Sequence, residues 1–219
     1  MKMRENRKNF CAAAGLLAAF ALWTAAVRFV DVRTIGPQGS AVGFAALNGF
    51  VHRLTGVHMS LYTVTDWLGL VPFGFVMGFG GLGLGQWIRR KRLSKVDFSI
   101  LVLGGFYLAV MAAYVFFEKV VVNYRPVLIG GVLEASYPSS TTMLVMCVMP
   151  TAVMQLNTRI RNSVFRRCTA CGMAAFTVFM VVGRLISGVH WFTDIAGGAL
   201  LSAGLVMMYR AVLRLKEMR

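Results

Sequence analysis

Charged residues are scarce in this sequence of 219 residues, and acidic residues are the scarcest. Only 14% of the residues are charged, whereas 58% are hydrophobic, and 8 Asp and Glu stand against 23 Lys and Arg. The apolar residues form unbroken blocks and do not follow the rhythm of an amphipathic helix or strand. This combination is typical of a membrane-spanning chain and argues against a soluble domain with one large core.

Cysteine is also rare, and its positions argue against a disulfide framework. Cys11 and Cys147 lie within apolar runs, and Cys168 and Cys171 form one isolated C-x-x-C pair. That pair lies at the predicted inner end of a span, where the compartment is reducing. A lone C-x-x-C is weak support for a metal or redox site, so we expect these cysteines to serve helix packing.

Six apolar segments are candidates for transmembrane helices, because a helix needs about 20 apolar residues to cross ~30 Å of hydrocarbon. The first is too long for the core of a signal peptide, and no small-residue cleavage site follows it. The fourth is the shortest and contains Pro150. The sequence therefore predicts an all-α integral membrane bundle, one domain over residues 1–219, with spans at 10–30, 67–88, 98–117, 141–156, 168–186 and 193–213.

Basic residues predict the orientation, because Lys and Arg collect on the cytoplasmic side of a membrane. With the N-terminus inside, 17 of the 23 basic residues fall in cytoplasmic segments. Both termini are then cytoplasmic. Basic loops beside an anionic inner leaflet account for the net charge of +15, so no nucleic-acid partner is expected. The outer loops lack an Asn-x-Ser/Thr glycosylation pattern, which suits a bacterial inner membrane.

Two stretches on the predicted outer face concentrate ionisable residues. The first, "FEKVVVNYRPVLIGGVLEASYPSSTT", follows the third span, and the second, "GRLISGVHWFTD", joins the fifth and sixth spans. The intervening spans bring both stretches to the same surface of the membrane. We therefore expect them to form one site.

The second stretch contains Arg184, His190 and Asp194. If a helix begins near Val189, His190 and Asp194 share one face and their side chains meet. An aspartate that accepts from one imidazole nitrogen leaves the other free as a base or nucleophile, and a guanidinium matches two phosphate oxygens. The alternative is a structural Arg–Asp pair beside an interfacial histidine.

The first stretch has the form of a helix start. Pro138 and then Ser139, a candidate N-cap, precede the fourth span, and the free N–H groups of such a start bind anions. Arg125, just before Pro126, adds a second guanidinium. A phosphate site fits these residues, and the alternative is a capped helix beside snorkelling arginines.

Together these stretches resemble the type 2 phosphatidic acid phosphatase superfamily, integral membrane enzymes with the signatures K-x6-R-P, P-S-G-H and S-R-x5-H-x3-D. The matching segments are "EKVVVNYRP", "PSST" and "GRLISGVHWFTD", in that order. The resemblance covers about residues 118–194, and the six-span layout agrees with the usual core of the family.

The resemblance implies a phosphate transfer that needs neither metal nor cofactor. His190 would attack phosphorus and form a phosphohistidine that water then hydrolyses, and Asp194 would orient His190. The phosphate oxygens would be bound by Arg125, Ser139, Ser140 and Arg184.

The chain departs from the signatures at several positions. Glu118 stands where the family has lysine, and Lys119 is one residue off, about 100° around a helix. Ser140 and Thr141 replace the glycine and the histidine of the second signature, and Gly183 replaces the serine of the third. Because the missing histidine protonates the leaving group in the family, Glu118, Lys119 and Thr141 are candidate auxiliary residues.

Three functions are compatible with this pattern. The first is a phosphatase acting on a lipid diphosphate, such as a polyprenyl carrier, because a phosphate leaving group needs no added proton. The second is a lipid head-group or phosphate transferase, and the third is a non-catalytic protein that binds or carries a lipid phosphate. A minor alternative is a metal site formed by Glu118, Glu134 and Asp194.

Overall fold

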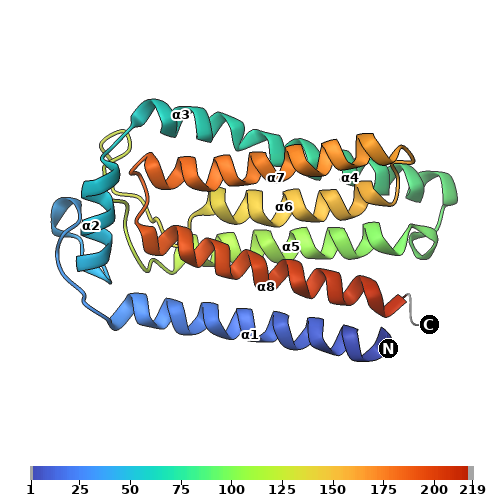
Figure 1. Ribbon diagram of the computed structural model, residues 1–219, viewed down its shortest axis with the longest axis horizontal. Helices are drawn as coiled ribbons and strands as arrows, with labels where there is room; N and C mark the ends of the chain where they lie inside the picture. The colour runs from blue at the N-terminus through green and yellow to red at the C-terminus, as the bar shows by residue number, and fades with distance from the viewer. Residues whose placement is uncertain (1, 217–219) are drawn as a thin grey trace.

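The computed structural model describes residues 2–216, and it is helical throughout apart from connecting loops. Figure 1 shows long helices packed side by side, with the short α2 lying across one end. In chain order the elements are α1 (Lys2–Phe29), η1 (Pro37–Gly39), α2 (Ala45–Thr55), α3 (Met59–Leu68), α4 (Leu70–Arg90), η2 (Leu93–Lys95), α5 (Phe98–Lys119), α6 (Ser140–Asn157), α7 (Ser163–Ile186) and α8 (Phe192–Lys216).

Five helical segments within residues 2–216 are long and apolar enough to cross a membrane, so the chain is an integral membrane protein. They are Met3–Phe29, Met59–Arg90, Phe98–Lys119, Ser163–Ile186 and Phe192–Lys216. They correspond to five of the six predicted spans. The second predicted span, 67–88, lies within a longer helical segment, because α3 and α4 together run from Met59 to Arg90.

The remaining predicted span, 141–156, is the helix α6, which is not among those five segments. α6 packs against α4, α5, α7 and α8, and half of its 18 residues are buried. Its buried side chains include Thr151 and Gln155, which hydrogen-bond within the bundle. Because helices surround α6, it needs less apolar surface than a lipid-facing span. A sixth crossing of the membrane stays a prediction.

The two ends of the bundle differ. Figure 1 shows both termini, together with the α4–α5 and α6–α7 connections, at one end, and α2 with the long loops at the other. Both ionisable stretches, residues 117–142 and 183–194, reach the loop end. The sequence predicted only a loop between the first two spans. In the structure this segment contains α2 and the start of α3, which cover the loop end of the bundle.

Candidate active site

A polar cavity of about 240 Å³ lies at the loop end of the bundle. Its wall combines the last turn of α5, the loop before α6, the first turn of α6 and the loop between α7 and α8. The side chains that bear on its chemistry are Glu118, Arg125, Glu134, Ser136, Ser140 and His190. The two ionisable stretches, which we expect from the sequence to meet, therefore line one cavity.

The loop that carries His190 is held in place by the first outer segment. Gly188 has a φ of +69°, and a Cβ there would lie 2.0 Å from the carbonyl oxygen of Gly56. Only glycine avoids both the strained backbone and this collision. The amide of His58 also donates to the carbonyl of Ser187 at 3.0 Å. The segment between α2 and α3 thus fixes the position of the His190 loop.

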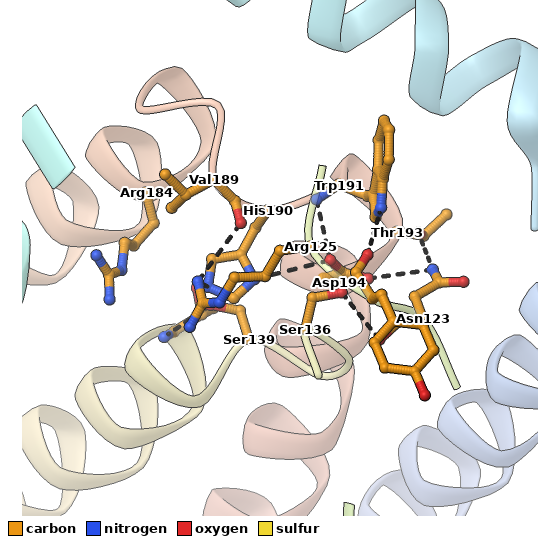
Figure 2. A network of polar contacts seen from close by, with 12 residues as sticks. Asn123, Arg125, Ser136, Ser139, Arg184, Val189, His190, Trp191, Thr193 and Asp194 are labelled. Carbon is orange, nitrogen blue, oxygen red and sulfur yellow. Dashed lines mark hydrogen bonds and ion pairs between the residues drawn. The ribbon is translucent and has the colours of Figure 1, made fainter. Parts of the chain in front are cut away.

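His190 and Arg125 meet directly (Figure 2). Nη1 of Arg125 lies 3.1 Å from Nε2 of His190 and 3.4 Å from the carbonyl oxygen of Val189. A guanidinium can only donate, so Nε2 accepts and the imidazole carries its proton on Nδ1. The nitrogen beside the arginine is therefore the one with a free electron pair.

Burial keeps this imidazole neutral. His190 is 3% exposed. Burial, aided by the positive charge of Arg125 and opposed by Asp194, lowers the pKa of His190 from 6.5 to about 4. A ring with this pKa is neutral near pH 7, and a neutral imidazole is the form that can act as a base or nucleophile.

Asp194 lies behind His190, away from the cavity. Its Oδ2 is 3.7 Å from Nδ1 of His190, which is longer than a hydrogen bond. Asp194 is fully buried and accepts from the amide of Trp191 at 2.9 Å and from Nδ2 of Asn123 at 3.3 Å. The condition that a helix begins near Val189 is not met, because α8 begins at Phe192, and Asp194 holds the turn before it.

Arg125 is shared between His190 and a carboxylate. Its Nε donates to Oε2 of Glu134 at 2.9 Å, and its side chain is 11% exposed. The ion pair fixes the plane of the guanidinium, while Nη1 reaches His190. The ion pair with Glu134 also neutralises part of the positive charge that Arg125 would present to a phosphate.

Arg184, the other predicted phosphate ligand, does not line the polar cavity. Its Nη2 donates to Asp66 at 3.0 Å and to Oγ1 of Thr141 at 2.8 Å. Nη1 lies 3.3 Å from Oγ1 of Thr65, and the guanidinium stacks over the Tyr62 ring. In Figure 2 its side chain points away from the His190–Arg125 pair. Phosphate binding by Arg184 stays a prediction, and in this structure its donors hold Asp66 and Thr141.

The residues around the start of α6 divide between structural and cavity positions. Ser139 caps the helix, since its Oγ accepts from the amide of Thr142 at 3.4 Å, and it is fully buried. Ser140 lines the polar cavity. Thr141 lines a neighbouring cavity and accepts from Arg184. On α5, Glu118 lines the polar cavity and Lys119 is not among its lining residues.

Sequence reasoning gave no role to Asp66 and Asn123, and it considered Glu134 only as a metal ligand. Asp66 neutralises Arg184, Glu134 pairs with Arg125, and Asn123 supports Asp194. Acidic residues are so rare in this chain that each one near the outer face was already a candidate residue of the site. Asp66 lies far from both stretches in sequence, and only the packing of α3 on α7 brings it to Arg184.

Two apolar cavities continue from the polar one along the bundle. The first, of about 390 Å³, shares Tyr114, Ser140 and Met143 with it. The second, of about 570 Å³, lies between α4 and α5 and shares Val76, Tyr107 and Met111 with the first. A polar chamber therefore adjoins a long apolar path between helices.

The carboxylates do not form the metal site that was considered as an alternative. Glu118 and Glu134 line the polar cavity, but Asp194 is buried behind His190, where Trp191 and Asn123 hold its oxygens. Within residues 2–216, no group of three or more His, Cys, Asp or Glu is placed to hold a metal ion.

Comparison with known proteins yields a structural match. Neither a family model nor a curated protein matches the sequence. A solved structure, the first transmembrane PAP2 type phosphatidylglycerolphosphate phosphatase from Bacillus subtilis, superposes with a TM-score of 0.60 at 18% identity, over 95% of this chain and 98% of that chain. The chain shares the fold of a PAP2-type membrane phosphatase. At this identity, the match establishes the fold, and the chemistry has to be argued from the site.

Proposed function

We propose that this protein is a membrane lipid phosphatase that works through a phosphohistidine at His190. One observation carries the proposal: Nη1 of Arg125 lies 3.1 Å from Nε2 of His190 in a polar cavity. A phosphate between these groups would receive the guanidinium donors on its oxygens and the imidazole electron pair on phosphorus. Positioning and charge neutralisation of this kind supply most of the catalysis in phosphoryl transfer.

The reaction follows from the geometry in two steps. The phosphate displaces the hydrogen bond between Arg125 and His190, and the arginine donors then bind phosphate oxygens. Nε2 attacks the terminal phosphorus while the P–O bond to the rest of the lipid breaks, and the lipid monophosphate leaves with the electron pair of that bond. The ring gains positive charge, which the carboxylate of Asp194 stabilises across Nδ1. Closing the 3.7 Å separation to a hydrogen bond of roughly 2.7–3.2 Å strengthens this support. Water then attacks phosphorus and releases Nε2.

Additional donors come from the start of α6. Ser140 faces the cavity, and the first amides of an 18-residue helix carry partial positive charge. Arg184 holds Asp66 and Thr141, so its contribution to phosphate binding is indirect. Its ion pair fixes α3 against α7 beside the first turn of α6.

The apolar cavities favour a lipid as the substrate. They begin at Tyr114, Ser140 and Met143 on the wall of the polar cavity and follow α4 and α5 along the bundle. A phosphate head in the polar cavity therefore leaves an apolar path for its tail. Burying a long hydrocarbon chain there contributes binding energy of about 0.8 kcal/mol for each CH₂ removed from water.

The lipid is proposed to be a diphosphate with a polyprenyl tail. Thr141 stands where the resembling family has its proton donor, and its hydroxyl accepts from Arg184 outside the polar cavity. A diphosphate expels a phosphate group with a second pKa near 6, which needs little protonation. A monophosphate expels an alkoxide, which needs much more.

Phosphate release by purified protein from matched lipids tests this function. We expect release from a polyprenyl diphosphate in detergent, with the monophosphate of the same tail cleaved more slowly. Transfer of the phosphate to a lipid or sugar acceptor without free phosphate would favour the transferase. Binding without any turnover would favour the carrier.

The cavity is proposed to face the outside of a bacterial inner membrane, since the opposite end carries the basic connections. In a variant without the four native cysteines, Thr34→Cys at the exposed loop end should react with an impermeant maleimide on intact cells. Ser94→Cys, exposed at the other end, should react only after lysis. The reverse pattern would place the site in the cytoplasm.

A further inference from the structure

We propose that Glu118 is the general acid, and then the general base, for lipid monophosphates. This inference rests on the proposed phosphatase function and extends it to substrates whose leaving group needs a proton. Glu118 lines the same polar cavity as His190 and Arg125. No role in proton transfer belongs to Thr141, which contacts Arg184 outside that cavity.

The last turns of α5 direct Glu118 toward the cavity. Tyr114, Phe117 and Glu118 all line it, and residues three and four apart share one face of a helix. The apolar part of this wall belongs to Tyr114 and Phe117, so Glu118 is the polar end of the face. It lies where the chain of α5 leaves the bundle.

The other titratable groups of the cavity either have partners already or are chemically unsuited to donate a proton to the leaving group. Arg125 cannot release a proton, and it already holds Glu134 in an ion pair at 2.9 Å. The Tyr137 hydroxyl is bound to Oγ1 of Thr24 at 2.7 Å, and burial raises the pKa of that hydroxyl. Tyr114 and Glu118 remain, and a carboxyl exchanges its proton much closer to neutral pH than a phenol does.

The protons balance over the two steps of the reaction. In the first, Nε2 of His190 bonds to phosphorus, the P–O bond to the lipid breaks, and the departing oxygen takes the proton from the Glu118 carboxyl. In the second, the Glu118 carboxylate takes a proton from water, the water oxygen bonds to phosphorus, and the P–N bond breaks. Glu118 is then protonated again.

The test uses polyprenyl monophosphate and diphosphate of the same tail length, and the readout is the ratio of their kcat/KM values. Glu118→Gln should lower the ratio of monophosphate to diphosphate cleavage by about 10²–10⁴-fold, the usual worth of general acid help. Glu118→Asp should retain more of the ratio than Glu118→Gln. The fall in monophosphate cleavage at high pH should disappear in Glu118→Gln, because that fall reports loss of the donated proton.

Matched variants distinguish general acid catalysis by Glu118 from the alternative explanations. Lys119→Gln, next in the chain and not among the cavity-lining residues, should leave the ratio unchanged. If Tyr114→Phe lowers the ratio and Glu118→Gln does not, the acid is Tyr114 and the proposal is wrong. An equal rise in kcat/KM for both lipids in Glu118→Gln would show that Glu118 only repels phosphate, which also overturns it.

Failure of this inference is distinguishable from failure of the phosphatase function. If the wild-type protein cleaves the diphosphate and never the monophosphate, Glu118 is not an acid and the phosphatase stands. If it cleaves neither lipid, both proposals fall.

Discussion

Arg125 and Arg184 are the arginines of the two motif stretches, yet the structure gives them different surroundings. Arg125 faces the polar cavity and reaches Nε2 of His190, with Glu134 as a partly exposed partner. Arg184 is 3% exposed in its side chain and is held by Asp66, Thr65 and Thr141. Arg125 borders a cavity, and Arg184 joins helices.

The two arginines differ because the fold places different neighbouring residues beside each of them. Arg125 is in a loop, so its guanidinium can remain at the cavity wall with one carboxylate. Arg184 is in the last turn of α7, where α3 brings Asp66 within reach. A buried guanidinium without a carboxylate is costly, so a nearby aspartate determines where the arginine lies. Motif spacing alone does not contain that information.

Replacing Arg125 should give the largest effect of the two arginines on catalysis. Arg125→Lys keeps the positive charge but loses the fork that joins Glu134 to His190, so kcat/KM for a lipid diphosphate should fall by about 10²–10³-fold. The measurement is steady-state phosphate release in detergent. Arg28→Lys, at the same end of the bundle and bound to the carbonyl of Val121, is the control and should stay near wild type. Equal losses in both variants would contradict a specific role for Arg125.

Replacing Arg184 should act mainly on stability. Arg184→Lys retains a charge for Asp66 but loses the hydrogen bonds to Thr65 and Thr141, which should cost about 2–3 kcal/mol of unfolding free energy. Thermal unfolding in detergent measures this, and kcat of the folded fraction should change far less than in Arg125→Lys. If Arg184→Lys keeps its Tm and loses kcat as Arg125→Lys does, the contrast between the two arginines fails.

The smallest expected effect is the pH dependence that His190 contributes. Its pKa is about 4 in the folded protein and near 6.5 when unfolded, so the unfolded state binds more protons between these values. Stability from this group is complete above pH 6.5 and is lost as the pH falls toward 4, by about 2 kcal/mol between pH 7 and 5. Comparing the Tm of wild type and His190→Ala across this range isolates the contribution. An identical pH dependence in both proteins would mean that His190 titrates normally.

Much of the fold follows from the sequence, because long apolar runs have few alternatives to membrane-spanning helices. Five of the predicted segments coincide with such helices, and the start of α6 after Ser139 agrees with its cap. The extension of the second span back to Met59 and the helix α2 escaped prediction, since neither is a strongly apolar run. Their positions depend on packing against the His190 loop, where Gly188 meets Gly56.

Within the site, the sequence predicted which residues share a surface and could not predict which side chains converge. His190, Arg125 and Ser140 line one cavity, and Ser139 and Asp194 support it from buried positions. Arg184 and Thr141 lie outside that cavity for a tertiary reason, the presence of Asp66 on α3. The roles of all these residues stay predictions until activity is measured.

The role of His190 as the nucleophile can be measured as phosphate release from polyprenyl diphosphate by His190→Ala under single-turnover conditions. The variant removes the imidazole whose Nε2 lies 3.1 Å from Nη1 of Arg125. We expect a loss on the order of 10⁴–10⁶-fold, as for other enzymic nucleophiles, with lipid binding retained. Turnover within tenfold of wild type would contradict it.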